Sequence, residues 1–260
     1  MNIIVCIKQV PDTADVKWTD KNTLSREGAE SVINPCDLYA IETALRLKDN
    51  QNANVTAISM GPMQAQSALR EAIAMGIDQG ILLCDKFFAG SDTAATSKVL
   101  AKAVNKIGNF DLIICGQFAS DGDTAQTGPS LSQNLHLGVV TNVLEIESIN
   151  ENKIIVKKFS DDGTERVEAK LPCVICIQKN DYAIRLPKIS GRIKSQNCEI
   201  PAYNAEDIGI TPEEAGFKGS PTYVKKAFRP NSRTAGEIFT DKTSQEAATL
   251  ILEEIQNCKG

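Results

Sequence analysis

The sequence predicts an α/β fold with a mainly parallel sheet, a β-hairpin extension and a C-terminal arm that ends in a helix. Three features of the 260-residue chain predict it. Over the first 137 residues short β-type runs alternate with helical patterns, and such βα units build a parallel sheet with helices on both faces. After His136 the runs are β-type, and from 185 to 240 prolines interrupt the chain.

The elements of the first half follow one another regularly. A helix is expected to begin with Asn34 as N-cap and Pro35 in the first position, which are the residues favoured there. Gly61-Pro62 ends the second strand. The buried strands are expected at 3–7, 55–60, 81–84 and 112–115, and two further helices carry apolar stripes over 65–73 and 99–107.

The second half is expected to add three strands to the same sheet and then leave it. The strands are 143–149, 154–158 and 167–177, with a hairpin turn at 160–163. Residues 185–240 hold five of the ten prolines and read as an irregular arm. A capping box at Thr243 and Glu246 opens a last amphipathic helix, which needs a surface to lie on. We therefore divide the chain into a domain, 1–184, and an arm with its helix, 185–260.

Composition excludes several classes of function. A net charge of −5 and a pI near 5.1 argue against a nucleic-acid partner, since phosphate binding over a surface needs basic residues. No apolar run approaches the ~20 residues that span a bilayer, and no basic leader precedes the first strand, so no membrane insertion and a cytoplasmic location are expected. Eight cysteines scattered singly fit a reducing compartment.

A ligand crevice is expected where the parallel strands end, because ligands of open parallel sheets collect beyond the carboxyl ends of the strands. Three segments leave those ends: Lys8–Thr13, Ser59–Pro62 and Gly116–Pro129. The third combines two glycines with hydroxyl, amide and carboxylate groups and leads into a helix, whose N-terminus favours an anion. It predicts a nucleotide site, and the alternative is a simple capped loop.

The position of Pro129 favours Thr127 over Asp123 as the N-cap of that helix, which makes 124–127 the phosphate-facing loop. Asp121 and Asp123 would repel a phosphate, so at least one of them is assigned to ribose hydroxyls or a backbone cap. The sequence contains neither G-x-x-x-x-G-K-[ST] nor a G-x-G-x-x-G after the first strand. This disfavours a P-loop NTPase and an ordinary NAD-dependent dehydrogenase.

No catalytic or metal-ligating group can be selected from the sequence. Cys173 and Cys176 form a C-x-x-C, but in a strand positions i and i+3 point to opposite faces, so we expect a structural pair. The single histidine, His136, is expected at a helix C-terminus. No nucleophile has an adjacent base, so no catalytic residue and no metal site are expected.

The chain resembles the β (small) subunit of electron-transfer flavoproteins over essentially its full length. The most specific match is the hairpin pattern from Val156 through Asp161-Asp162-Gly163 to Val167, with the following Pro172-x-Val174-Ile175-Cys176. The order and spacing of the pieces make the resemblance strong. The other matching pieces are Val5–Asp12, Asn34–Asp37, Ile58–Pro62, Ala74–Asp78, Gly116–Gly128 and Arg233–Gly236.

The resemblance implies a heterodimer whose α subunit holds one FAD, while the β subunit binds a second nucleotide in a Rossmann-like domain. In housekeeping members this nucleotide is AMP. In electron-bifurcating or -confurcating members it is a second FAD that exchanges electrons with NAD(H). The implied cofactor-binding residues are Cys6, Ile7, Lys8, Asn34, Pro35, Cys36, Asp37, Met60, Gly61, Gly116, Gln117, Phe118, Ala119, Ser120, Asp121, Gly122, Asp123, Thr124, Ala125, Gln126 and Thr127.

The resemblance favours FAD over AMP. AMP-binding members typically read Asp-Asp-Asp-x-Asn-Gln-Thr-Gly, whereas this chain has Gly122 and Ala125 in place of two larger polar residues. The smaller residues suit the backbone approach and the space that a diphosphate requires. The expected function is electron bifurcation or confurcation among NAD(H), a low-potential carrier such as ferredoxin or flavodoxin, and a flavin dehydrogenase. The alternative within the family is a redox-silent AMP form.

The family's partner-recognition loop corresponds to Tyr182–Lys194, and Leu186 is the residue that matches the leucine docking on the dehydrogenase. Pro187 and Arg233, Thr234, Ala235 and Gly236 are further expected partner contacts. The lead-in to Leu186 differs from the usual Glu-Pro-Arg-Tyr, so besides an acyl-CoA dehydrogenase the partner can be a 2-hydroxyacid dehydrogenase or another CoA-thioester reductase. An alternative of another class, a stand-alone nucleotide-binding stress-type protein, leaves the arm unexplained.

Overall fold

The computed structural model describes residues 1–12, 17–18, 24–25, 31–225, 236 and 238–257. The chain forms two compact units, Met1–Lys226 and Ala227–Gly260. In its described part the first unit contains a nine-stranded sheet of order β11-β10-β9-β12-β8-β1-β6-β7-β13. In this sheet order, every neighbouring pair between β9 and the edge strand β13 is parallel. At the other edge, β10 runs antiparallel to β9 and β11. The predicted α/β class with a mainly parallel sheet and a hairpin extension is confirmed.

The strands and helices have the following bounds. The strands of the large sheet are β1 Asn2–Cys6, β6 Asn54–Met60, β7 Gln79–Leu83, β8 Leu112–Gly116, β9 Gly138–Ile149, β10 Lys153–Ser160, β11 Gly163–Lys170, β12 Cys173–Ile177 and β13 Ala202–Tyr203. Two small pairs are β2 Gln9–Pro11 with β5 Ser31–Ile33, and β3 Lys17–Trp18 with β4 Leu24–Ser25. The helices are α1 Pro35–Gln51, α2 Gln66–Met75, α3 Thr93–Ile107, α4 Thr127–Leu135, α5 Ile189–Asn197, α6 Gly216–Gly219 and α7 Ser244–Asn257, with 3₁₀ turns η1 Met63–Ala65 and η2 Lys86–Phe88.

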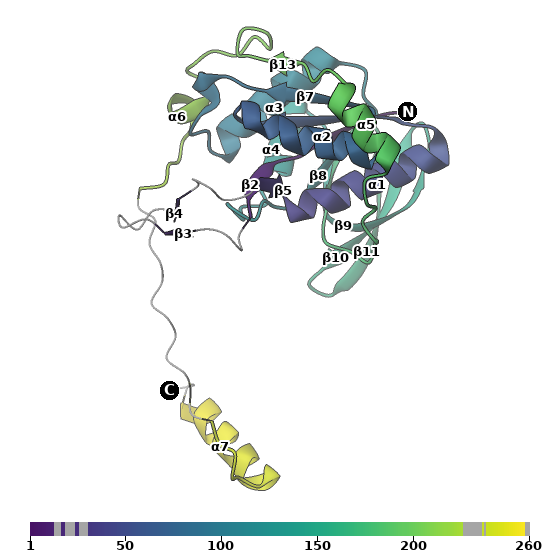
Figure 1. Ribbon diagram of the computed structural model, residues 1–260. Coiled ribbons are helices and arrows are strands. Elements are labelled where there is room, and N and C mark those ends of the chain that lie inside the picture. Colours follow the sequence, from purple (N-terminus) through teal and green to yellow (C-terminus); the bar gives the residue numbers. More distant parts are fainter. Residues whose placement is uncertain (13–16, 19–23, 26–30, 226–235, 237, 258–260) are drawn as a thin grey trace. The chain divides into compact units, whose positions relative to one another are not determined.

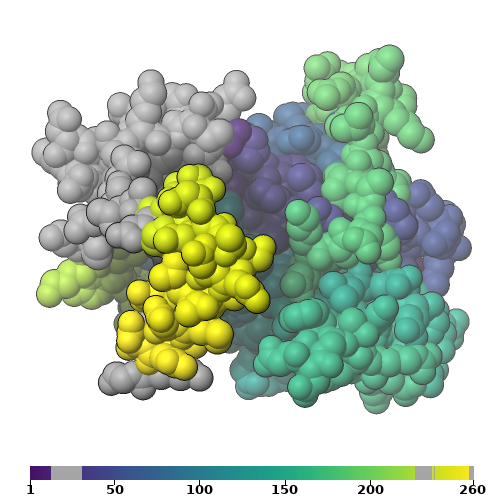
Figure 2. All heavy atoms as spheres, turned by 90° about the horizontal axis from the view of Figure 1, so that it is seen from below, coloured from purple at the N-terminus to yellow at the C-terminus, as the bar shows by residue number. Residues whose placement is uncertain are grey.

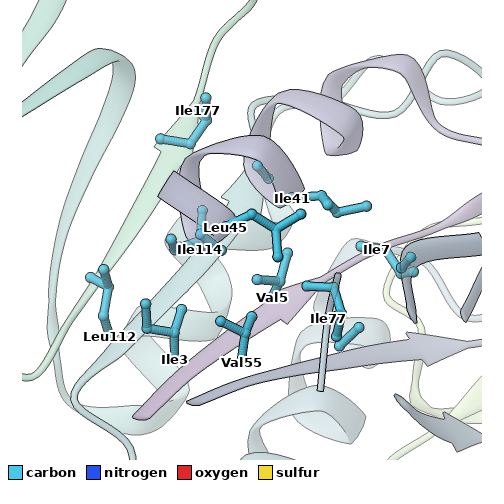
Figure 3. Packing of buried hydrophobic residues seen from close by; sticks show 14 of the residues in the cluster. Ile3, Val5, Ile7, Ile41, Leu45, Val55, Ile77, Leu112, Ile114 and Ile177 are labelled. Atoms are coloured by element: carbon cyan, nitrogen blue, oxygen red, sulfur yellow. The ribbon is translucent and has the colours of Figure 1, made fainter. Parts of the chain in front are cut away.

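Side chains alternate across the sheet, so the core has two parts. Ile3 and Val5 face α1 and α2, whereas Ile4 and Cys6 face α3 and α4. Figure 3 shows Ile41 and Leu45 of α1 lying against strand side chains on the face of the sheet that α1 and α2 cover. Both are fully buried, so truncating either to alanine would cost about 2–5 kcal/mol. The two faces together hold the strand ends, and hence the crevice, in fixed register.

The expected strand 167–177 is wrong as one element. The structure ends β11 at Lys170 and begins β12 at Cys173, because Pro172 has no N–H to donate to a ladder. The hairpin turn itself is confirmed, with Ser160 opposite Gly163. After Pro172 the chain leaves the hairpin, and β12 lies in the sheet between β9 and β8.

The expectation of an irregular stretch from 185 to 240 is also corrected. It contains α5, which packs on α2, and β13, which pairs with β7 at the sheet edge. Pattern alone missed α5 because its apolar residues face outward while Gly191 lies against α2. The contact boundary between the two units lies at 226/227, whereas the sequence places the start of the arm at 185.

The last helix forms where the sequence placed it. In the second unit, Thr243 and Glu246 exchange hydrogen bonds as a capping box, and α7 follows from Ser244. Its apolar side chains Ile251, Leu252 and Ile255 are exposed. No described helix is both long and apolar enough to cross a membrane.

Candidate functional site: a polar crevice at the ends of β1 and β8

The crevice lies where the strand order reverses. From β1 the chain moves through β6 to β7 on one side, and it returns to place β8 on the other side of β1. Cys6 of β1 is in register with Cys115 of β8, so Lys8 and Gly116 leave the sheet side by side. Ligands of open α/β sheets bind at such a switch point.

Asn34 joins the segments that follow these two strands. Its carboxamide donates to the Phe118 carbonyl over 2.9 Å and accepts from the Ser120 N–H over 3.0 Å. Its backbone N–H donates to the Lys8 carbonyl over 2.8 Å. Asn34 occupies the predicted N-cap position of α1, but its side chain bridges the loop instead of capping the helix.

Asp37 fixes the same junction from below. Its Oδ2 accepts the Lys8 N–H over 2.7 Å, and a Cβ at Gly116 would lie only 2.2 Å from its Oδ1. Only glycine therefore fits at 116. Burial raises the pKa of Asp37 to about 7, although hydrogen bonds from Asn34, Lys8 and Gly116 act to lower it. Asp37 thus faces the chain's own backbone and positions the crevice.

Lys8 holds the long loop over the end of β1. Its Nζ lies 2.6 and 2.8 Å from the two carboxylate oxygens of Asp121. This ion pair neutralises one of the two carboxylates of the loop. In the described part of the chain Asp123 forms no ion pair, so of the two carboxylates it is the one not neutralised by a lysine or arginine.

Residues 122–127 form the turn that leads into α4. The N–H groups of Gly122 and Asp123 both donate to the Ala119 carbonyl, over 3.1 and 2.7 Å. Asp123 and Ala125 have positive φ values of 48° and 54°. The N–H groups of 124–127 have no acceptor among the described residues. Such a run of free donors at the N-terminus of a helix is suited to an anion.

The helix that follows begins one residue earlier than expected. Gln126, and not Thr127, is the N-cap of α4, and Pro129 lies in the first turn as argued. A Cβ at Gly128 would lie 2.3 Å from the Cys176 Sγ, so glycine lets this turn rest on the sheet. By contrast a Cβ at Gly122 would meet nothing within 4 Å. The space beside Gly122 is open.

The remaining expected residues lie at or near the ends of the same strands. Cys6 ends β1 and Ile7 follows it, and Met60 ends the neighbouring β6, after which the Gly61 N–H donates to the Leu83 carbonyl over 3.0 Å. Cys36 lies in the first turn of α1, and burial raises the pKa of its thiol. The structure therefore brings all three expected segments to one edge.

Sequence reasoning missed the contribution of β9 and β12. The Gln117 N–H donates to the Ile177 carbonyl, and the Gln117 side chain accepts from the Asn142 N–H, both over 2.8 Å. Gln178 follows β12, and its Oε1 is a buried acceptor without a donor among the described residues. These contacts form because β12 lies next to β8, and no local sequence pattern indicates that neighbourhood.

Cys173 and Cys176 lie on opposite faces of the sheet, as expected from the strand period. Cys173 packs in the core on the α1 side of the sheet and Cys176 in the core on the α4 side. Burial raises the pKa of Cys173 to about 11, and it also raises that of Cys176. No group of three or more potential ligands suited to a metal occurs among the described residues.

The expected partner contacts are only partly described. Leu186 is 84% exposed and Pro187 is half-buried. Arg233, Thr234 and Ala235 lie outside the described residues, and Gly236 is exposed. Figure 2 shows α5, in green, projecting at the edge of this face of the molecule.

A nucleotide phosphate fits these residues. The free N–H groups of 124–127 supply donors, and the open space beside Gly122 admits a close approach. The same donors suit one phosphate or two. The fold is a doubly wound α/β sheet, and a loop with free N–H groups lies at its switch point.

Comparison with known proteins identifies the family. The family model described as "Electron transfer flavoprotein domain" matches residues 21–208. An electron transfer flavoprotein subunit beta of Thermoanaerobacterium thermosaccharolyticum is 44% identical over 96% of both chains. The Caffeyl-CoA reductase-Etf complex subunit CarD of Acetobacterium woodii is 42% identical over 98% of both, and Protein FixA of Azorhizobium caulinodans is 38% identical over 98% of this chain and 94% of its own. The chain belongs to the electron transfer flavoprotein family, as a β subunit. A β subunit has an α-subunit partner.

Proposed function

We propose that this β subunit binds FAD in the crevice and, together with its α subunit, passes electrons among NAD(H), a ferredoxin or flavodoxin, and an FAD-dependent dehydrogenase. The observation that carries the proposal is the run of free N–H groups at 124–127, next to the open face of Gly122. These donors bind phosphate oxygens, and no side-chain bulk blocks the extension from a monophosphate to a diphosphate. We place the complex in the cytoplasm.

The residues of the crevice have distinct roles in this proposal. The N–H groups of 124–127 hold the phosphates, and Asp123 accepts from the ribose. Asn34 and Asp37 hold the Lys8 and Phe118–Ser120 backbones in place, through bonds of 2.7–3.0 Å. Bound FAD supplies hydride and single-electron chemistry. The chain itself supplies binding and orientation, and no residue of the crevice acts as a catalytic acid or base.

Support for a dehydrogenase or reductase partner comes from the comparisons. One relative carries the name of a complex in which a CoA-ester reductase and an electron transfer flavoprotein are associated. The exposed Leu186 at the start of the segment that includes α5 is the proposed contact, with Pro187 and residues 233–236 as further contacts.

A second candidate is structural binding of AMP without redox chemistry. It is favoured by the Lys8–Asp121 ion pair, which leaves the Lys8 ammonium neutralised and not free to pair with an anionic flavin. The N–H groups of 124–127 would then hold a single phosphate.

Replacement of Thr124 by tryptophan in the heterodimer tests the proposal. The wild type is expected to hold two FADs and to be reduced by NADH, and T124W is expected to keep only the α-bound FAD and lose NADH-dependent bleaching. The matched control is T164W on the exposed hairpin strand β11, which should retain both flavins. Two FADs and intact NADH reduction in T124W would contradict the proposed site.

A further inference from the structure

The chain segment that leads into α5 carries exposed apolar side chains. Leu186, Ile189 and Ile193 are 84, 81 and 57% exposed. We call residues 186–193 the docking segment, since Leu186 belongs to the proposed partner contact. A docking surface binds more tightly when the free protein already holds its side chains in the bound orientation, because ordering them on association costs binding free energy.

Glu42 of α1 is the buried charge beside this segment. It is only 3% exposed, and its carboxylate receives four hydrogen bonds. Arg185, the residue before Leu186, provides three of them: Nε and the backbone N–H donate to Oε2 over 2.9 and 3.2 Å, and Nη2 donates to Oε1 over 3.2 Å. Arg46 Nε provides the fourth over 3.0 Å. A two-point contact from one guanidinium fixes direction as well as distance.

The neighbouring turns of α1 complete this clamp. Glu42, Arg46 and Asp49 are spaced so that they share one face of the helix. Asp49 Oδ2 lies 3.0 Å from Arg185 Nη1, and the Arg46 guanidinium stacks 3.9 Å above the ring of Tyr182. Residues 182–185 are therefore held at both ends by a single helical face.

The body of α5 is held by different residues. A Cβ at Gly191 would lie 2.1 Å from the Ala74 carbonyl, which shows how closely α5 packs on α2. Arg70 of α2 donates to the Ser195 and Cys198 carbonyls at the C-terminal end of α5. Loss of the Glu42 clamp should therefore free the root of the docking segment and leave α5 on α2.

We propose that Glu42 is a positioning residue for partner docking: its buried carboxylate fixes Arg185 and thereby the direction in which Leu186 and Ile189 are presented. This rests on the proposed function, in which a flavin dehydrogenase docks at Leu186. Glu42 acts through Arg185 and touches neither partner nor cofactor. The same helix, α1, also begins at the crevice with Asn34–Asp37, so it orients both surfaces.

The test uses the heterodimer and compares four variants: E42Q, R185M, the E42Q/R185M double variant, and L186A. The probe is an acyl-CoA dehydrogenase that the wild-type heterodimer reduces. E42Q and R185M should each raise the KM for the dehydrogenase about tenfold, or about 1.4 kcal/mol of docking free energy, with kcat little changed. The double variant should be no worse than the poorer single one, because both remove the same contact. The matched control is E147Q, which removes the exposed ion pair between Glu147 of β9 and Arg166 of β11 and should change nothing.

Amide hydrogen exchange provides a readout that does not depend on the partner. E42Q should accelerate exchange at 182–188 and leave 192–197 in α5 unchanged, and NADH-dependent flavin reduction should be intact. A normal KM and normal exchange in E42Q, with a raised KM in L186A, would overturn the positioning role while the docking site stands. A normal KM in L186A would overturn the docking site itself, and the positioning role with it.

Discussion

Replacing Asp37 by asparagine should remove a pH dependence of folding that this one carboxyl group causes. Asp37 is buried, and its pKa is raised from 3.8 to about 7, chiefly because burial disfavours the charged form. Asparagine has the same shape and does not ionise. The difference in unfolding free energy between wild type and D37N therefore isolates the titration of this group.

The sign follows from proton binding. Between pH 4 and 7 the native chain holds a proton on Asp37 that the unfolded chain has released, so raising the pH destabilises the native state. The slope is about 1.4 kcal/mol per pH unit, and the total is roughly 4 kcal/mol, reached near pH 7 and constant above it. The contribution of Asp37 to stability is thus fully present below pH 4 and lost as the pH rises through 7.

Urea denaturation of the nucleotide-free chain at half-unit steps from pH 5 to 8.5 measures the effect. The unfolding free energy of wild type minus that of D37N should fall as the pH rises to about 7 and then level off. A difference that stays constant from pH 5 to 8.5 would refute the assignment of a raised pKa to Asp37. Such a constant difference would mean that the hydrogen bonds outweigh burial, because a lowered pKa changes stability only below about pH 4.

Three further predictions concern other parts of the chain. Deleting 237–260 should leave the 1–226 unit folded but weaken the complex with the α subunit, as measured by co-purification and α-bound FAD; unchanged co-purification would speak against an intersubunit role for α7. Replacing Cys173 and Cys176 by alanine, singly and together, should cost about 1–2 kcal/mol each in urea and leave NADH-driven flavin reduction intact, whereas metal or a disulfide between the two in purified protein would show that the pair is not merely structural. Truncating Asn34 to alanine should remove two part-buried hydrogen bonds, to the Phe118 carbonyl and the Ser120 N–H, cost about 1 kcal/mol and lower nucleotide affinity measured by calorimetry; normal affinity would show that this bridge does not support the crevice.

Local sequence patterns predicted much of the fold because they depend on neighbouring residues alone. The N-cap position of Asn34 and the capping box at Thr243 follow from side chains within one turn. The separation of Cys173 and Cys176 follows from the two-residue period of a strand. The meeting of the ends of β1, β6 and β8 at one edge was predictable from the alternation of strands and helices, which indicates a parallel sheet.

The features that the sequence did not indicate depend on contacts between distant residues. β12 enters between β9 and β8, and this brings Gln117 to Asn142 and Ile177. The side chain of Asn34 bonds a loop more than 80 residues away instead of its own helix. α5 has no buried apolar stripe; the close approach at Gly191 and hydrogen bonds from Arg70 hold it on α2 instead. Each depends on which segments are brought together in the fold.

The nucleotide content of the purified wild-type α/β heterodimer tests the central claim most directly. Acid extraction followed by chromatography counts FAD and AMP per heterodimer without any substitution in either chain. Because the crevice offers free donors at 124–127 and open space at Gly122, we predict two FADs and no AMP, with both flavins bleached by NADH. One FAD and one AMP per heterodimer, with no bleaching by NADH, would contradict FAD binding in the crevice and establish the AMP form.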